Sequence, residues 1–263
     1  MATVHDIERY IDSIAPGYMA ESWDNVGLLC GDRAQPVHKL LVALDPFEGV
    51  CAEAVQLGAD LIVTHHPLIF AAPKSITEDT SVGRCVRTLC SHGISAINAH
   101  TNLDCASGGV NDVLAQVLGL SDVQIINPVG TDANGKPYGL LRSGRLSPTA
   151  LPDFLDQVKQ ALHTPVLRYA DGGRPVCRVA VGGGACAGEL MEAFDAGCDT
   201  FVTSDVKYNQ FWDAQDLGMN LIDAGHFYTE NPAVMVLARK LQEHFPEIQV
   251  CFSESHADCM KFF

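Results

Sequence analysis

The sequence is short of basic residues. It carries 17 Lys and Arg against 32 Asp and Glu, which gives a formal net charge of -15. Nucleic acids and anionic membrane surfaces are bound through a basic footprint, so this balance argues against both as default partners. Any anionic substrate would have to be held by a local cationic site.

A long apolar run is also missing. No segment approaches the roughly 20 consecutive apolar residues that a membrane-spanning helix needs. The first residues, MATVHDIERYIDSIAP, are amphipathic and acidic, unlike a secretory signal peptide. We therefore expect no membrane association and a cytoplasmic location.

Closely spaced cysteine pairs are absent too. The ten cysteines are scattered without a Cys-x-x-Cys pair, at positions 30, 51, 85, 90, 105, 177, 186, 198, 251 and 259. This pattern argues against a zinc ribbon, and we interpret the cysteines as buried free thiols in a reducing compartment.

What the chain does have is the pattern of an α/β protein. Its 263 residues, 47% of them hydrophobic, can bury a sizeable core. Periodicity predicts strands near 39–44, 60–64, 94–98, 122–126, 138–146, 176–182, 199–203, 219–223 and 247–252. It predicts helices near 4–14, 47–57, 80–92, 109–118, 148–162, 187–196, 206–216 and 230–244. The alternation indicates a mostly parallel or mixed sheet covered by helices.

The sequence also indicates an internal duplication. Residues 51–66 align with residues 190–205 at an offset of 139 and share six identities. Turn-forming residues gather between positions 127 and 139 and mark a boundary. We predict two pseudo-symmetric α/β lobes, at 1–126 and 127–263, with the C-terminal segment as a candidate to pack back on the first lobe.

Each repeat delivers a histidine followed four residues later by a carboxylate. These pairs are His100 with Asp104 and His226 with Glu230, and a strand end before them carries His65 and His66. Imidazole and carboxylate are ligands for borderline divalent metals, so the clusters predict one composite metal site.

Plainer interpretations of these pairs remain. The pair His226 and Glu230 can instead cap a helix or form a weak surface ion pair. His100 is either a ligand or a residue that orients one. The other six histidines lack such neighbours and are expected at the surface, namely those at positions 5, 38, 92, 163, 244 and 256.

A glycine run offers a competing interpretation. Residues 182–188 fit Gly-x-Gly-x-x-Ala between a strand and a helix, and Asp205 ends the next strand, as in a dinucleotide-binding fingerprint. Such runs more often serve backbone geometry at a tight turn, and this is the interpretation we favour.

Five strings carry a family resemblance: ESWDNVGLLCGD at 21–32, THHPLIF at 64–70, NAHTNLD at 98–104, GGVND at 108–112 and DAGHFYTE at 223–230. The chain resembles the dinuclear metal-centre family of GTP cyclohydrolase I type 2 homologues, also called NIF-three-like proteins. The resemblance implies two α/β lobes, a two-metal site and a toroidal homohexamer. It assigns His65, His66 and Asp104 to the metals, together with His226 and a bridging Glu230. The chain departs from the family pattern at Ser204 and Asn209, which bears on substrate contacts.

A site with two metal ions that share a carboxylate is typical of metal-dependent hydrolases, so we predict a hydrolase that acts on a small molecule. A nucleotide is one candidate substrate. Glu230 and Asp205 are the candidate catalytic residues, and Lys207 is a candidate phosphate or acid–base partner. The cyclohydrolase resemblance implies hydroxide attack at the purine C8 of GTP. Zinc, iron, manganese, cobalt and nickel all suit the ligand set. The alternative is a non-catalytic scaffold that binds or handles metal.

Overall fold

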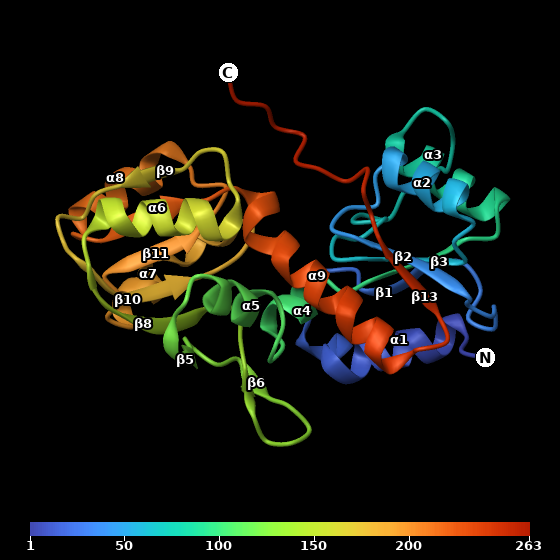
Figure 1. Cartoon of the computed structure of the whole chain (residues 1–263), viewed down its shortest axis with the longest axis horizontal. Helices are drawn as coiled ribbons and strands as arrows, with labels where there is room; N and C mark the ends of the chain where they lie inside the picture. The colour runs from blue at the N-terminus through green and yellow to red at the C-terminus, as the bar shows by residue number, and fades with distance from the viewer. The chain divides into compact units, whose positions relative to one another are not determined.

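The computed structural model describes residues 1–263, which fold as two compact units (Figure 1). Unit 1 comprises Met1–Ala106 and Val234–Asp258, and unit 2 comprises Ser107–Ala233 and Cys259–Phe263. These limits differ from the predicted lobes, because residues 107–126 fold with unit 2 and residues 234–258 with unit 1. None of the helices combines the length and the hydropathy needed to cross a lipid bilayer.

Unit 1 is built on a five-stranded sheet with the order β1-β4-β3-β2-β13. The strands are β1 (Gly27–Cys30), β2 (Lys39–Ala43), β3 (Leu61–Thr64), β4 (Ser95–Asn98) and β13 (Gln249–Phe252). Strands β13, β2, β3 and β4 run parallel, and β1 pairs antiparallel with β4. Strand β3 is buried along its whole length, as expected for a central parallel strand.

Helices cover both faces of this sheet (Figure 1). They are α1 (Val4–Ile14), the 3₁₀ turn η1 (Gly17–Met19), α2 (Glu48–Leu57), α3 (Ser81–Ser91), α4 (Thr101–Cys105) and the later part of α9 (His226–His244). The apolar sides of α2 and α3 meet one face of the sheet in a single buried cluster. Helix α1 is capped by Thr3, whose capping box with Asp6 satisfies backbone groups at the helix start. Tyr10 of α1 stacks on His244 of α9 with ring centroids 4.0 Å apart.

Unit 2 is built on a six-stranded sheet with the order β5-β8-β10-β11-β12-β9 and a small separate hairpin of β6 and β7. The strands are β5 (Ser121–Ile125), β6 (Gly130–Thr131), β7 (Pro137–Tyr138), β8 (Arg142–Thr149), β9 (Arg168–Ala170), β10 (Val176–Val181), β11 (Thr200–Thr203) and β12 (Asn220–Asp223). Strands β10, β11 and β12 are parallel.

The helices of unit 2 lie in two layers. They are α5 (Val110–Val117), α6 (Leu151–Leu162), the 3₁₀ turn η2 (Cys186–Glu189), α7 (Leu190–Asp195), α8 (Tyr208–Asp216) and the start of α9. One buried cluster joins α5 and α6 to Val179 and Val181 of β10. Ala180, between these two residues, belongs to a different cluster with η2, α7 and α8. The alternation along β10 therefore fills a core on each face of the sheet.

The two units repeat one local arrangement. The parallel set β2-β3-β4 of unit 1 corresponds to β10-β11-β12 of unit 2. Thr64 ends β3 and pairs with Asn98, while Thr203 ends β11 and pairs with Asp223. These are the equivalent strand ends that the duplication predicts, so the fold class of two pseudo-symmetric α/β lobes is confirmed.

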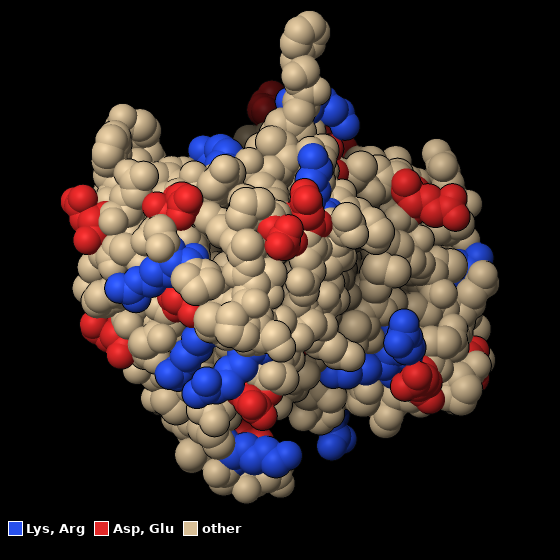
Figure 2. Space-filling view, turned by 60° about the vertical axis from the view of Figure 1, so that its left-hand side comes forward, with Lys and Arg blue, Asp and Glu red and all other residues tan.

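On the face shown in Figure 2, Lys and Arg side chains lie interspersed with Asp and Glu and do not form a continuous basic stripe. All ten cysteines are free thiols. Six of them are buried, namely Cys30, Cys51, Cys85, Cys105, Cys186 and Cys198.

Candidate metal centre

In unit 1, three histidines gather where strands β3 and β4 end. His65 and His66 follow β3 directly, and His100 lies two residues beyond β4. Because the two strands are parallel neighbours, their carboxyl ends meet at the same edge of the sheet. One ligand nitrogen from each of the three rings lies within 4.8 Å of the others. The sheet topology thus creates a cluster that could hold a metal ion.

Each of these rings has an oxygen acceptor at its Nδ1 atom. The distances are 2.8 Å from His65 to the carbonyl of Ala99, 2.6 Å from His66 to Asp45 and 2.9 Å from His100 to Asp24. A carbonyl or carboxylate oxygen can only accept, so Nδ1 carries the proton in the neutral ring. The Nε2 atom is then the nitrogen that can bind a metal.

Asp24 orients His100 from the loop before β1. Its carboxylate also accepts hydrogen bonds from the backbone nitrogen and the hydroxyl of Thr101, at 3.0 and 2.5 Å. Burial alone would raise the pKa of Asp24, but the bonds from His100 and Thr101 hold this pKa well below its usual value. Asp24 is therefore a buried carboxylate kept in its charged form.

The loop that carries Asp24 is itself fixed to the sheet. Asn98, at the end of β4, donates from Nδ2 to the carbonyl of Asn25 at 3.1 Å. Asn25 donates in turn to the carbonyl of Ile69 at 2.6 Å. These bonds join the loop of Asp24 to the segments that follow β3 and β4.

Asp45 orients His66 from the end of β2. Its Oδ1 atom faces His66, and its Oδ2 atom lies 2.7 Å from the Nε2 atom of His256. Burial would raise the pKa of Asp45, but the bonds from these two histidines lower it well below its usual value. The prediction that His256 lies at the surface is wrong, because its side chain is only 5% exposed. The other five of those histidines are exposed, as predicted.

Asp104 is the carboxylate of this cluster. Helix α4 begins after His100, so the histidine and Asp104 lie one turn apart, as the spacing predicts. The Oδ1 atom of Asp104 is 3.6 Å from the Nε2 atom of His65. Two ligands of one tetrahedral ion with bonds of about 2.1 Å stand about 3.4 Å apart, so this separation suits a shared metal.

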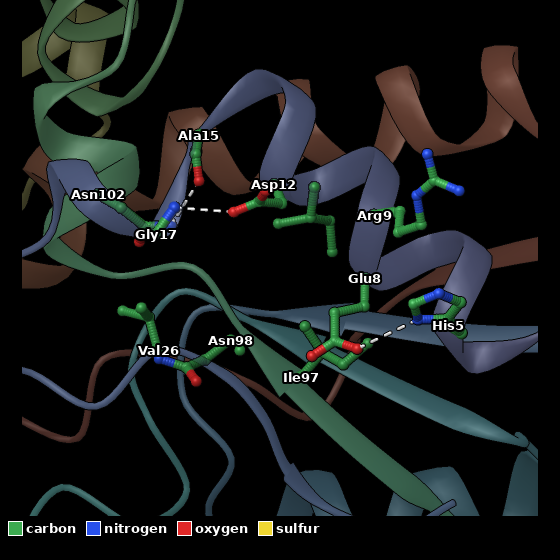
Figure 3. A pocket seen from close by; sticks show the side chains of 12 residues that line it. His5, Glu8, Arg9, Asp12, Ala15, Gly17, Val26, Ile97, Asn98 and Asn102 are labelled. Atoms are coloured by element: carbon green, nitrogen blue, oxygen red, sulfur yellow. Dashed lines mark hydrogen bonds and ion pairs between the residues drawn. The ribbon is translucent and has the colours of Figure 1, made fainter. Parts of the chain in front are cut away.

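Asn102 holds the start of α4 by two hydrogen bonds. Asn102 accepts from the backbone nitrogen of His100 at 2.8 Å and donates to the carbonyl of Ala15 at 2.7 Å. Figure 3 shows this contact at one end of a hollow of about 280 Å³, which α1, β1 and β4 line. Asn98 lines the same hollow. The residues that support His100 thus form part of a separate cavity wall.

Unit 2 places its pair in the first turn of α9. The Nε2 atom of His226 is 3.0 Å from the Oε2 atom of Glu230, and Nδ1 is 2.8 Å from Asp205. Burial lowers the pKa of His226, but the bonds to the two carboxylates outweigh it and raise this pKa to about 11. The bond from His226 in turn lowers the pKa of Asp205. Asp205 thus contacts Nδ1 of His226 in the same way as Asp24 contacts Nδ1 of His100.

The glycine run packs around this pair. Gly184 has a φ of +63°, and a Cβ added there would stand 2.0 Å from the Oε1 atom of Glu230. The backbone nitrogen of Gly184 donates to the hydroxyl of Thr229 at 3.0 Å. The run is followed by the 3₁₀ turn η2, which continues directly into α7. The backbone conformation and small size of Gly184 thus leave room for the side chain of Glu230.

The donor set fits a divalent metal. Within unit 1 lie three imidazoles and a carboxylate, and within unit 2 lie an imidazole and a carboxylate; the Nδ1 atom of each imidazole faces an oxygen acceptor. The sequence analysis gave no role to the orienting residues Asp24, Asp45 and His256. A signal was present for Asp45, because an acid directly after a buried strand faces the same sheet edge as the histidines.

Comparisons with known proteins identify the family and the fold of the chain. The model of the Duf34/NIF3 (NGG1p interacting factor 3) family matches residues 2–259. A GTP cyclohydrolase 1 type 2 homolog of Clostridium perfringens is 34% identical, with 98% of this chain and 99% of the relative covered. A GTP cyclohydrolase 1 type 2 homolog of a Nostoc species is 39% identical, with 84% of this chain and 88% of the relative covered. Among solved structures, a hypothetical protein of Staphylococcus aureus has a TM-score of 0.91 at 32% identity, with 99% of both chains covered. A Bacillus cereus protein related to NIF3 has a TM-score of 0.93 at 26% identity, with 100% of this chain and 99% of that protein covered.

Proposed function

The chain belongs to the Duf34/NIF3 family, and we propose that it binds two divalent metal ions and acts as a metal-dependent hydrolase. The observation that carries the proposal is the orientation of the histidines. Four imidazoles, those of His65, His66, His100 and His226, each present Nδ1 to an oxygen acceptor. Such acceptors fix the ring and its tautomer in metal sites. One ligand nitrogen from each of the rings of His65, His66 and His100 also lies within 4.8 Å of the others.

The proposed ligand set draws on both units. His65, His66, Asp104 and His100 come from unit 1, and His226 and Glu230 come from unit 2, with Glu230 as the bridging carboxylate. Support comes from the duplication, because equivalent strand ends deliver both His-x-x-x-acid pairs. The number of ligands is further support, since six are too many for one four-coordinate ion.

Divalent ions held there would act as Lewis acids that let water serve as a nucleophile near neutral pH. The carboxylates of the chain would then orient the histidine rings, and one of them would exchange protons with solvent. Asp24 and Asp45 hold the rings of His100 and His66 through Nδ1. Asp205 holds His226 and, at about half exposure, is also the carboxylate best placed to exchange protons with solvent. This dual role makes Asp205 the proposed acid–base residue.

For the substrate, we propose a small electrophilic molecule, with a purine nucleotide tried first. The support is the name shared by the Clostridium and Nostoc relatives, which refers to a GTP cyclohydrolase. Lys207, the exposed residue that precedes α8, is the proposed contact for a phosphate. The toroidal homohexamer implied by the family resemblance belongs to the same proposal, and light scattering of the purified chain tests it.

The deciding experiment is a hydrolysis screen with metal-stripped and metal-reconstituted protein. GTP, other purine nucleotides, phosphoesters and activated esters serve as substrates, and His65→Ala and Glu230→Ala are the test variants. Reconstituted wild type should turn over at least one substrate, and both variants should lose metal and activity together. The exposed His92→Ala is the matched control. Fully loaded wild type that turns over nothing yet exchanges metal reversibly would favour the metal-handling scaffold instead.

A further inference from the structure

His256 lies far along the chain from the histidine cluster but close to it in unit 1. It belongs to the segment after β13, and its Nε2 atom is 2.7 Å from the Oδ2 atom of Asp45. The other oxygen of Asp45 lies 2.6 Å from Nδ1 of His66. One carboxylate therefore joins a candidate metal ligand to a histidine 211 residues from that carboxylate in sequence.

The segment that carries His256 is fixed to α2. Glu53 accepts from the hydroxyls of Ser253 and Ser255, each at 2.5 Å, and from the backbone nitrogen of Glu254 at 2.9 Å. The backbone nitrogen of His256 donates to the hydroxyl of Ser253 at 3.2 Å. The anchoring of the segment thus does not depend on the contact between His256 and Asp45.

His256 is also enclosed. Its side chain is nearly buried, and the ring of Phe47, just before α2, lies almost parallel to it at an interplanar angle of 13°. A buried polar ring is retained where its hydrogen bond is needed. Here that bond goes to Asp45, the carboxylate that lies 2.6 Å from Nδ1 of His66.

The two bonds of Asp45 limit its motion. A carboxylate with a single partner can rotate about its side-chain bonds and still keep that bond. With an imidazole on each oxygen, the plane of the Asp45 carboxylate is set, and so is the direction from which it meets His66. Outer partners of this kind fix the orientation of a ligating imidazole and raise its affinity for metal.

We propose that His256 is a positioning residue of the metal centre, which fixes His66 through Asp45. The inference rests on the proposed metal-binding function. It adds the segment between β13 and residue 258 to the parts of the chain that determine metal affinity.

The test measures the apparent dissociation constant for Zn²⁺ by competition with a chromophoric chelator. His256→Phe keeps an aromatic ring against Phe47 but removes the donor to Asp45, and His256→Ala removes the ring as well. Both should weaken Zn²⁺ binding by about 10- to 100-fold, the usual effect of losing an outer partner of a metal ligand. His256→Gln, which restores an N–H donor, should recover most of the affinity.

Ser255→Ala is the matched control, because it removes a bond of the same segment to Glu53 without touching Asp45. It should leave Zn²⁺ affinity unchanged even if the metal-free protein unfolds at a lower temperature. Equal Zn²⁺ affinity in wild type and His256→Phe would overturn the inference, and so would an equal loss in Ser255→Ala. Wild type that binds no Zn²⁺ would instead refute the proposed function itself.

Discussion

Gly184 leaves the space that the carboxylate of Glu230 fills. A Cβ atom at residue 184 would stand 2.0 Å from the Oε1 atom of Glu230 and 3.3 Å from Nε2 of His226. The backbone of Gly184 is also in the left-handed region, with φ at +63°. The position of a candidate metal ligand thus depends on the absence of a side chain 46 residues earlier in the chain.

We therefore predict that Gly184→Ala impairs metal binding. The added methyl group displaces the end of the Glu230 side chain, and the left-handed backbone costs about 1 kcal/mol of stability. Metal content per chain, measured by elemental analysis after reconstitution, should fall below that of wild type. Gly188→Ala is the control in the same run, because a Cβ there meets no atom within 4 Å. Equal metal content in both variants would contradict the role given to Gly184.

A second prediction concerns stoichiometry. Reconstituted wild type should hold about two transition-metal ions per chain, because the proposed ligand set exceeds what one four-coordinate ion can use. Asp104→Ala and Glu230→Ala should each lower this number, while circular dichroism shows the fold retained, since the core of each unit is apolar. Asp213→Ala, at an exposed position of α8, serves as the control. A wild-type content of zero would refute the metal centre.

Asp24 should make the metal-free protein sensitive to acid. The pKa of Asp24 is lower in the folded chain than in the unfolded one. Its contribution to the free energy of unfolding is therefore present above a pH of about 4 and is lost as the pH falls further. Asp24→Asn should lower the free energy of unfolding by about 1 to 3 kcal/mol at pH 7, as expected for a buried charged hydrogen-bond partner. Urea denaturation at pH 7 and pH 3 should show the difference shrinking in acid. A constant difference would contradict this account.

His226 should link metal binding to proton release. Its pKa of about 11 means that both ring nitrogens of His226 are protonated in the metal-free protein at pH 8, and a metal must displace one of these two protons. Metal affinity should therefore rise with pH. In the metal-free protein the stabilisation from this proton is fully present below a pH of about 6.5 and is lost as the pH rises through about 11.

Calorimetry in buffers with different ionisation enthalpies measures this proton release. Wild type should release about one proton more per chain than His226→Ala when Zn²⁺ binds at pH 8. His163→Ala, an exposed histidine of unit 2, should behave like wild type. The account fails if His226→Ala and wild type release the same number of protons.

Much of the fold was predictable because buried parallel strands and amphipathic helices leave strong local patterns. The end of β3 at Thr64 and of β11 at Thr203 follows from the duplicated segments. Elements that are short lack such patterns, and β1, α4 and β9 were not predicted for this reason. The predicted start of the last helix at residue 230 was wrong. Helix α9 begins at His226 and continues past Pro232, a residue type that usually interrupts a helix.

The candidate ligands were predictable because His-x-x-x-acid is a local pattern that a helix start converts into one face. Their orienting partners were not. Asp45 is 21 residues from His66, Asp24 is 76 from His100, and His256 is 211 from Asp45. Neither periodicity nor spacing links residues at such separations. The parallel order of β2, β3 and β4 brings Asp45 and the histidines to one edge, and the antiparallel pairing of β1 with β4 brings the loop of Asp24 to the same edge.

These long separations also govern when the histidine cluster can form during folding. Contacts between residues far apart in sequence cost more chain entropy and tend to form late. Asp45, which orients the ring of His66, gains its hydrogen bond to His256 only after β13 has paired with β2. This pairing needs nearly the whole of unit 1. An early, partly folded chain would offer loose, poorly oriented imidazoles. Metal is therefore expected to enter a chain that has already folded, and it would not nucleate folding as zinc does in a zinc finger.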